Sequence, residues 1–185
     1  MKRVVDYLVG PTQSAFIEGR NILDNVIVAH ELVKGYSQKG VSPRCMVKVD
    51  IRKAYDSVNW NFLKMVLLEY GIPLKVVELI MTCVSTISYS LLINGGWTPI
   101  FQAKKGLRHE EPMSPYLFVL AMEYLNRPLK QLRYNPDFNY HTRADRFSIQ
   151  LLLQAFQHFS TISGLKANLK KSSFYVAGVS PEFKT

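Results

Sequence analysis

Residues 47–56, Val-Lys-Val-Asp-Ile-Arg-Lys-Ala-Tyr-Asp, decide the fold, because a short apolar strand runs directly into a carboxylate. Residues 45–49 are the predicted buried strand, and Asp50 follows at its end. A carboxylate there is held rigidly at a sheet edge, where oxygen ligands can bind the Mg²⁺ used in phosphoryl transfer. The alternative, which the spacing alone favours, is that Asp50 caps the next segment or pairs with a nearby Arg or Lys.

The rest of the chain mixes helices with short strands. Asn94-Gly95-Gly96 lies between two apolar runs and predicts a hairpin over residues 88–103, since Asn-Gly tolerates the positive φ of a tight turn. Residues 172–176 are a last predicted strand. Apolar residues at helical spacing predict helices over 22–36, 58–70, 73–84, 116–132 and 148–159. Together these elements predict an α+β fold.

Composition narrows the class of protein. With 48% hydrophobic and 20% charged residues, the 185-residue chain is globular. The net charge of +9 indicates a polyanionic partner, nucleic acid or an acidic membrane surface, against the alternative of a solvated basic surface. The most apolar run, residues 116–125, is too short to span a bilayer, so we expect a soluble cytoplasmic or nuclear protein with no membrane partner.

The two cysteines indicate no metal centre. Cys45 and Cys83 lie in apolar runs, which predicts buried free thiols. Neither has a Cys or His neighbour at zinc spacing, so we expect no zinc site.

Four stretches carry a family resemblance. Residues 47–63, with the core Asp-Ile-Arg-Lys-Ala-Tyr-Asp-Ser-Val-Asn-Trp, resemble motif A of reverse transcriptases from non-LTR (LINE-type) retrotransposons. Residues 13–25 resemble the fingers segment that precedes motif A, residues 106–118 resemble motif B, and residues 164–172 resemble motif D. The blocks come in family order and cover nearly the whole chain.

The resemblance implies a partial palm, with part of the fingers, of a right-hand polymerase. Its core would be ferredoxin-like, with residues 1–44 as a partial fingers segment and residues 45–185 as the palm-like region. The partners it implies are an RNA template and a DNA primer, and the cofactor it implies in the intact family is Mg²⁺.

The resemblance also assigns roles to single residues. Asp50 would ligate Mg²⁺, with the carbonyl of Ile51 assisting. Tyr55 would be the aromatic steric gate under the sugar of the incoming nucleotide, or otherwise an ordinary core residue. Lys171 would approach the departing pyrophosphate, or otherwise be a surface lysine in a basic run. Four further cations would face template, primer or triphosphate: Arg20, Lys104, Lys105 and Arg108.

The largest departure from the family is the absence of motif C, Phe/Tyr-Ala-Asp-Asp, which supplies the other catalytic carboxylates from a hairpin between motifs B and D. The chain contains no Asp-Asp pair. Residues 138–141 run directly into residues 142–147, which resemble the segment downstream of motif C. A deletion of roughly twenty residues between His141 and Thr142 accounts for this. Asp145 is then a residue at the start of the next helix, and strands 45–49 and 172–176 lose their expected partner.

These departures predict a catalytically defective reverse transcriptase fragment that binds no Mg²⁺ productively, because one aspartate cannot offset the repulsion between two divalent ions. Motif B is altered too: His109-Glu110-Glu111 stands where the family has Gln-Gly-Asp. Two alternatives stay open. One is a non-catalytic, basic nucleic-acid-binding remnant. The other is an active polymerase whose second carboxylate is one of Asp56, Glu110, Glu111 and Asp145.

Overall fold

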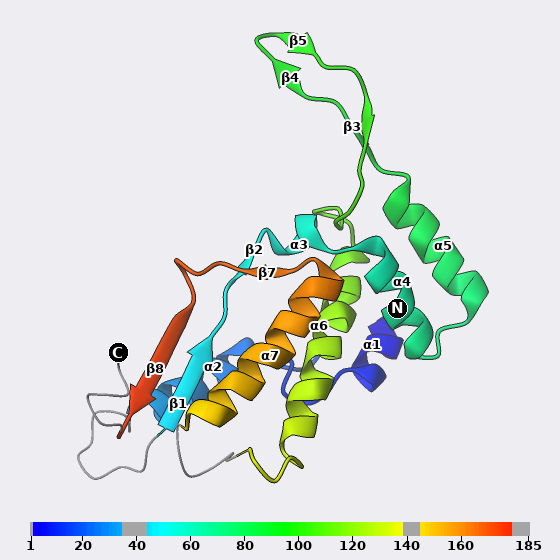
Figure 1. Cartoon of the computed structure of the whole chain (residues 1–185). Coiled ribbons are helices and arrows are strands. Elements are labelled where there is room, and N and C mark those ends of the chain that lie inside the picture. Colours follow the sequence, from blue (N-terminus) through cyan, green and yellow to red (C-terminus); the bar gives the residue numbers. More distant parts are fainter. Residues whose placement is uncertain (1, 35–43, 139–144, 179–185) are drawn as a thin grey trace.

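Helices dominate the described part of the chain, and the strands found there are short and form two-stranded pairs (Figure 1). The computed structural model describes residues 2–34, 44–138 and 145–178. Its helices are α1 (Lys2–Leu8), α2 (Ile22–Lys34), α3 (Ala54–Ser57), α4 (Trp60–Glu69), α5 (Leu74–Ser85), α6 (Ser114–Leu132) and α7 (Arg146–Ser163). Its strands are β1 (Arg44–Lys48), β2 (Ile51–Arg52), β3 (Ser88–Tyr89), β4 (Leu92–Ile93), β5 (Gly96–Trp97), β6 (Phe101–Gln102), β7 (Lys166–Ala167) and β8 (Ser173–Ala177). The predicted α+β class is confirmed.

The hydrophobic core lies where α4, α5, α6 and α7 meet. Each helix contributes one apolar stripe at helical spacing, such as Phe62, Leu63, Val66 and Leu67 on α4. The ring of Phe62 is central, because it meets Tyr124 edge-on at 5.4 Å and Phe159 at 5.8 Å. Aromatic pairs in this geometry add to the free energy gained by burial alone.

The strand that leads to Asp50 has an unexpected partner. β1 pairs antiparallel with β8 in the register Arg44↔Ala177 to Lys48↔Ser173. The partner expected for both strands was a motif C hairpin; in the structure they hydrogen-bond to each other instead. Within the described residues this ribbon is only two strands wide, so each strand keeps one unpaired edge.

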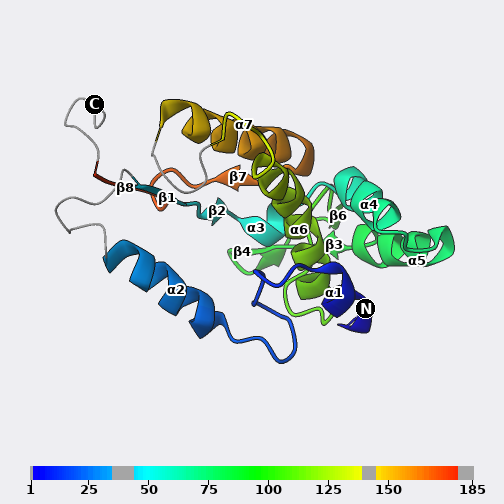
Figure 2. The same cartoon turned by 90° about the horizontal axis from the view of Figure 1, so that it is seen from below.

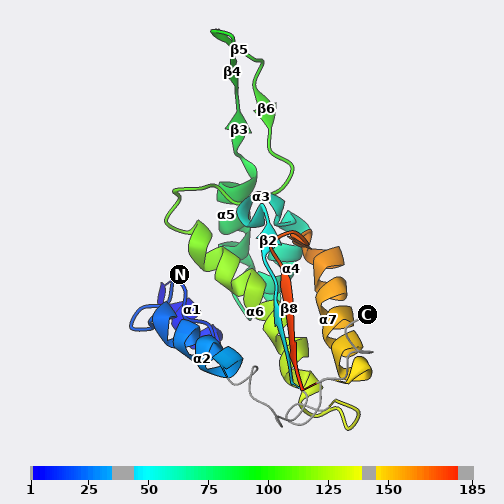
Figure 3. The same ribbon diagram turned by 90° about the vertical axis from the view of Figure 1, so that its left-hand side faces the viewer.

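The predicted hairpin is confirmed and forms an arm that projects away from the helices (Figures 1 and 3). Its turn uses positive φ at Asn94 (50°) and Gly95 (83°), as a two-residue turn requires. The arm carries no charged residue from 87 to 103, yet its apolar side chains are exposed, Trp97 at 73% and Ile100 at 74%.

The N-terminal segment contributes unevenly to the core. Val5 and Val9 are buried against the body, whereas α2 has no buried residue. In two perpendicular views the β1–β8 ribbon lies between α7 on one side and α2 on the other (Figures 2 and 3).

Most predicted helix ends shift by a few residues, for local reasons. The helix expected from residue 58 begins at Trp60, because the Asn59 side chain caps its first turn. The helix expected from residue 116 begins at Ser114, because Pro115 suits a first turn.

The prediction that Cys83 is buried is wrong, because Cys83 is exposed, and Cys45 is half-buried. No helix in the described part of the chain is long and apolar enough to cross a membrane.

Candidate active site

The backbone of Asp50 is fixed from the other end of the chain. Its N–H donates to the Ser172 hydroxyl at 3.0 Å, and its carbonyl accepts from the Asn168 N–H at 2.7 Å. The side chain of Asp50 is half-exposed, and its carboxylate has no hydrogen-bond or ion-pair partner among residues 2–34, 44–138 and 145–178. Asp50 is therefore a rigidly placed carboxylate that is open to a cation.

Ile51 follows Asp50 in the sequence, and Lys171 directly precedes Ser172, which binds the Asp50 backbone. Ile51 pairs with Ala167 across the β2–β7 ladder and packs against the hydrophobic core. Lys171 is exposed and lies in the turn 168–172, where its N–H donates to the Asn168 carbonyl at 3.0 Å. The structure therefore brings the turn that carries Lys171 next to the backbone of Asp50.

Tyr55 lies in a stack of rings. Its ring is stacked on Phe118 at 5.0 Å between centroids, and His109 lies 5.2 Å away on a tilted plane. Burial raises the pKa of the Tyr55 phenol above its ordinary value, so the group stays neutral at physiological pH. His109 also lies 3.3 Å from the Asp56 carboxylate through Nε2, and both side chains are exposed. Residues predicted from motifs A and B thus meet around one aromatic ring.

The segment 55–59 is clamped from two sides. On one side, the Tyr55 carbonyl accepts from Leu107 N–H and the Val58 carbonyl accepts from Gly106 N–H, both at 2.8 Å. On the other, Asn59 N–H donates to the Ser163 carbonyl at 2.8 Å. This clamp ties motif A to motif B and to the end of α7.

Glycine is required at both jaws of this clamp. A Cβ on Gly106 would lie 3.0 Å from the Asp56 backbone, and one on Gly164 would lie 2.6 Å from the Ser57 carbonyl oxygen. Both glycines have positive φ, 94° and 78°, which L side chains rarely adopt.

In motif B, Glu110 has the left-handed backbone conformation that glycine usually adopts. Glu110 has φ 65° and is exposed, in the position where the family has Gly. A left-handed conformation costs a non-glycine residue about 1–2 kcal/mol. The substitution of Glu for Gly thus leaves local strain in the loop beside His109.

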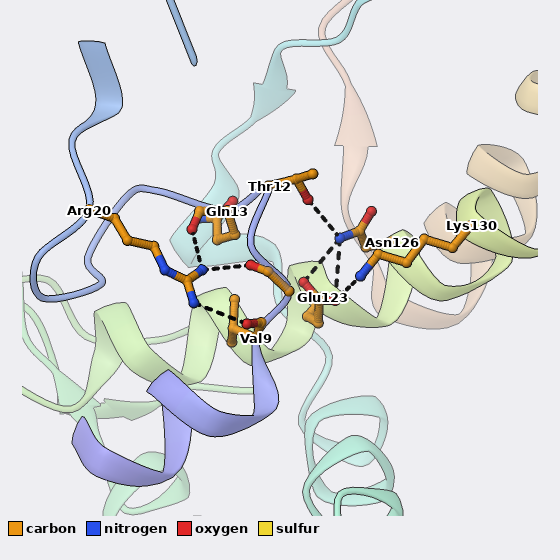
Figure 4. Close-up of polar contacts among 8 residues, drawn as sticks. Val9, Thr12, Gln13, Arg20, Glu123, Asn126 and Lys130 are labelled. Atoms are coloured by element: carbon orange, nitrogen blue, oxygen red, sulfur yellow. Dashed lines mark hydrogen bonds and ion pairs between the residues drawn. The ribbon is translucent and has the colours of Figure 1, made fainter. Parts of the chain in front are cut away.

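Arg20 lies in a cage of backbone carbonyls (Figure 4). Its guanidinium donates to the carbonyls of Gly10 at 2.6 Å, Gln13 at 2.7 Å and Val9 at 3.3 Å. These bonds shape the loop that joins α1 to the rest of the N-terminal segment. Contact between Arg20 and nucleic acid stays a prediction. In the structure the Arg20 guanidinium instead holds the loop through these three carbonyls.

A polar latch next to this loop was not predicted from the sequence. The buried carboxylate of Glu123 on α6 accepts from Lys130 Nζ at 3.0 Å and from Asn126 Nδ2, which also reaches Thr12 (Figure 4). A cavity of about 190 Å³ lies beside it, lined by Thr12, Gln13, Met122, Glu123, Leu125, Asn126 and Leu129. The i, i+3 and i+7 spacing of Glu123, Asn126 and Lys130 is the sequence signal that could have revealed this latch.

The other predicted phosphate contacts lie at the base of the arm. Lys104, Lys105 and Arg108 are exposed and flank the clamped residues Gly106 and Leu107. The structure brings these three cations together along one loop. Their binding of nucleic acid stays a prediction.

Comparison with known proteins identifies the family. Residues 1–184 match the family described as reverse transcriptase (RNA-dependent DNA polymerase). The chain belongs to this family. Its reverse transcriptase domain is of the non-LTR type, because the chain is 28% identical over 173 residues to the retrovirus-related Pol polyprotein from type-2 retrotransposable element R2DM of Drosophila melanogaster. That match covers 87% of this chain and 16% of the relative.

Two further similarities agree. The Pol polyprotein from type-1 retrotransposable element R2 of Popillia japonica is 26% identical over 103 residues, which cover 56% of this chain and 17% of the relative. An apo telomerase structure from Candida tropicalis, truncated from its C-terminal domain, matches with TM-score 0.60 and 13% identity over 89% of this chain and 36% of that one. The chain thus spans only a small part of these proteins, and its fold is a partial polymerase palm and fingers, as predicted.

The reverse transcriptase family implies Mg²⁺ in the intact enzyme, and the described residues gather no set of carboxylates around Asp50 that would hold two such ions. Among residues 2–34, 44–138 and 145–178, no three His, Cys, Asp or Glu side chains come together as metal ligands. Asp145, one candidate for a second carboxylate, instead caps α7: its Oδ1 accepts from Ser148 N–H at 2.7 Å and its Oδ2 from the Ser148 hydroxyl at 2.8 Å. The expected deletion point, between His141 and Thr142, lies outside the described residues.

Proposed function

We propose that this chain is a palm-and-fingers portion of a non-LTR reverse transcriptase that has lost polymerisation activity. The observation that carries the proposal is the isolation of Asp50. Its backbone is held by Ser172 and Asn168 as a catalytic corner needs, but the sequence supplies no Asp-Asp pair beside it. Two divalent ions about 3.5–4 Å apart need several converging carboxylates, and one cannot hold both.

The loss of polymerisation rate should be large. Each 1.36 kcal/mol of lost transition-state stabilisation lowers the rate tenfold. The two-ion clamp stabilises both the attacking and the leaving oxygen, so its absence removes many powers of ten. We expect primer extension on an RNA template to be undetectable with either Mg²⁺ or Mn²⁺.

The test is repair. A motif C hairpin of the family type, with its Asp-Asp pair, is inserted between His141 and Thr142, and the original and repaired chains are compared in primer extension. We expect only the repaired chain to extend the primer. The matched control is the same hairpin with Asn-Asn in place of Asp-Asp, which restores the strands but not the carboxylates. Extension by the original chain that Asp50→Ala abolishes would overturn the proposal.

The roles of the remaining residues belong to the same proposal. In the repaired chain, Asp50 and the Ile51 carbonyl hold metal, Tyr55 excludes the 2′-hydroxyl and Lys171 assists departure of pyrophosphate. The gate is tested by Tyr55→Ala, which should increase ribonucleotide incorporation. Since Tyr55 is stacked on Phe118, Tyr55→Phe is the control that keeps the stack. The division into a fingers segment, 1–44, and a palm, 45–185, is part of this proposal.

Nucleic-acid binding without catalysis is the second candidate function, favoured by the net charge of +9. Binding through phosphates releases counterions, so the affinity should fall steeply as salt rises. We expect a linear decrease of log K with log salt for an RNA–DNA hybrid. A flat salt dependence would exclude this function.

A further inference from the structure

The projecting arm is built from two strands of different kinds. Residues 88–93, which we call the open strand, contain neither a charged residue nor a proline. Residues 96–102, which we call the bulged strand, contain Pro99. Large apolar side chains on both strands are more than half exposed, among them Leu92 and Trp97. Within the described residues the arm is two strands wide, so each of its strands has one edge without a partner strand.

The bulged strand is unsuited to accept a further strand. Tyr89 pairs with Phe101 and Leu92 pairs with Trp97, so the two residues 90–91 of the open strand lie opposite the three residues 98–100. The extra residue is a β-bulge, and Pro99 within it has no N–H to donate. Bulges and prolines are means by which natural proteins protect the edge of a sheet. The outer edge of the bulged strand is therefore closed to pairing.

The open strand has none of these protections. The carbonyls of Ile87 and Leu91 point at the bulged strand, where they accept backbone N–H bonds at 3.0 and 2.8 Å. Because the direction of the backbone groups alternates along a strand, Ser88, Ser90 and Leu92 present their N–H and carbonyl groups at the outer edge. Such a row of backbone donors and acceptors is a template on which another strand can pair.

Charge indicates which strand fits this edge. The arm carries no charged residue from 87 to 103, so it offers no charge to pair with phosphate or with a charged peptide. A second copy of the open strand is equally neutral and apolar, and it meets the edge without repulsion between like charges. The net charge of +9 lies outside this stretch, and the arm projects away from the body that carries it (Figures 1 and 3).

We propose that two copies of this chain associate through their open strands, which pair antiparallel about a two-fold axis at Ser90. In this register Ser90 lies opposite its own counterpart, and Ser88 lies opposite the Leu92 position of the second copy, so the outward backbone groups of the two strands match. The two arms then form one continuous ribbon. Because the outer edge of each bulged strand is closed, the assembly ends at two chains.

Antiparallel pairing also keeps the two charged bodies apart. Each body lies at the base of its own arm, so the bodies lie at opposite ends of the ribbon. The paired residues 88–92 span about 17 Å at about 3.4 Å per residue, roughly twice the screening length of about 8 Å at physiological salt. Lys104 and Lys105, at the base of one arm, come beside the tip of the other, where Asn94-Gly95 is uncharged.

Sedimentation velocity of the full chain over a range of concentrations is the first test. The proposed interface is small, so we expect a reversible dimer with a dissociation constant of roughly 10 µM. Leu92→Pro removes one outward N–H from each copy, and proline is tolerated at the edge of a sheet. Two hydrogen bonds are lost from each dimer, so the dissociation constant should rise at least about tenfold.

Trp97→Pro is the matched control. Trp97 is the direct cross-strand partner of Leu92, and its backbone groups point at the outer edge of the bulged strand, because the next residue, Thr98, donates its N–H to Leu91. The same substitution on this closed edge should change the dissociation constant by less than about threefold. The Tm of each variant shows whether it folds. Equal weakening by the two prolines would overturn the assignment of the open strand.

Cysteine trapping tests the register without proline. In a Cys83→Ser background, Ser90→Cys should form a disulfide between copies, because directly opposite Cα atoms lie about 5.5 Å apart in a hydrogen-bonded antiparallel pair. Ser88→Cys is the control, since its counterpart lies about 13 Å further along the ladder. It should cross-link at least about tenfold more slowly. Equal rates would overturn the register centred on Ser90.

Salt separates association through the arm from association through bound nucleic acid. Raising the salt from about 0.05 M to about 0.5 M screens the repulsion between the two bodies, so the dimer should become tighter. Copies held together by a shared nucleic acid should instead separate as salt rises or when nuclease is added, and that result would overturn the proposal. A chain that stays monomeric at about 100 µM would also overturn it, and growth beyond the dimer would contradict the closed edge. None of these outcomes depends on polymerisation activity.

Discussion

Two parts of the molecule hold motif A in different ways. The segment 55–59 is clamped between Gly106 and Leu107 on one side and Ser163 and Gly164 on the other, above a closed helical core. Asp50, a few residues earlier, is carried by a two-stranded ribbon with an unpaired edge on each strand. The helical layer is therefore held by a packed core, whereas the segment that leads to Asp50 rests on a single strand pairing.

The largest difference between the two parts is expected when one phenylalanine is removed from each. Phe159 is 1% exposed in the core, and Phe174 is 46% exposed on β8. Phe159→Ala should lower the free energy of unfolding by about 3–5 kcal/mol, whereas Phe174→Ala should cost about 1 kcal/mol or less. Urea denaturation of both variants measures this. Equal losses would mean that the ribbon is as tightly packed as the core.

A smaller effect is expected from the clamp. Gly164→Ala places a Cβ against the Ser57 carbonyl and should cost about 2–4 kcal/mol of unfolding free energy. Gly71→Ala is the matched control, because Gly71 has nearly the same φ, 76° against 78°, but open space around it. It should cost about 1 kcal/mol from backbone strain alone. Similar values for the two variants would show that the clamp can open without loss.

Thiol labelling compares the ribbon with the helical layer without mutation. Burial raises the pKa of Cys45 to about 11, so at pH 8 only about one thiol in a thousand is thiolate there. Cys83 on α5 is exposed. Iodoacetamide should therefore modify Cys83 at least about tenfold faster at pH 8. Raising the pH towards 11 should speed the reaction of Cys45, and mass spectrometry of the peptides would follow both. Equal rates would show that the β1–β8 ribbon opens readily.

Removal of the side-chain cap of α7 should lower the free energy of unfolding only modestly. Asp145→Ala removes the side-chain bonds to Ser148 and should cost about 1 kcal/mol of unfolding free energy. Asp145→Asn should retain most of the stability, because an amide oxygen also caps a helix. In the repaired chain, both variants should extend primers normally. A loss of extension in Asp145→Asn with unchanged stability would restore Asp145 as a ligand.

The smallest effect concerns the motif B loop. Glu110→Gly relieves a left-handed backbone and should stabilise the chain by about 0.5 kcal/mol, after the greater freedom of glycine in the unfolded state is allowed for. Glu111→Gly, one residue later and without positive φ, should destabilise it by a similar amount. The two variants have the same composition, so a difference in urea midpoint isolates the conformation at residue 110.

The sequence predicted what depends on local signals. The helix predicted over residues 58–70 ends at Glu69, just before Gly71, and Asn94-Gly95 marks the turn of the arm, because helix ends and tight turns are decided within a few residues. The pairing of β1 with β8 could not be predicted, since it depends on which strand remains available elsewhere in the chain. α1 was missed because seven residues give too little periodicity to separate a helix from a loop.

For the candidate site, the sequence indicated which segments lie together, and the roles of the residues stay predictions. Motif spacing placed Asp50 and Lys171 on segments that the structure joins, but nothing local indicated that Arg20 would be held by carbonyls. Cys83 was misplaced because α5 is apolar on two faces. The buried face of α5 carries Val77, Ile80 and Val84, whereas Cys83 lies on the exposed face. An apolar run shows that a helix is apolar, not which face is covered.

The pairing of Lys48 with Ser173 also sets an order of events during synthesis. The two residues are separated by most of the chain, and closing so long a loop costs entropy that nearby helices do not have to meet. As the chain leaves the ribosome, α4, α5 and α6 can pack while residues 168–173 are still to be made. The corner around Asp50 is thus the last part to form, and a chain cut short before residue 168 would have a folded helical layer in which Asp50 lacks its backbone partners.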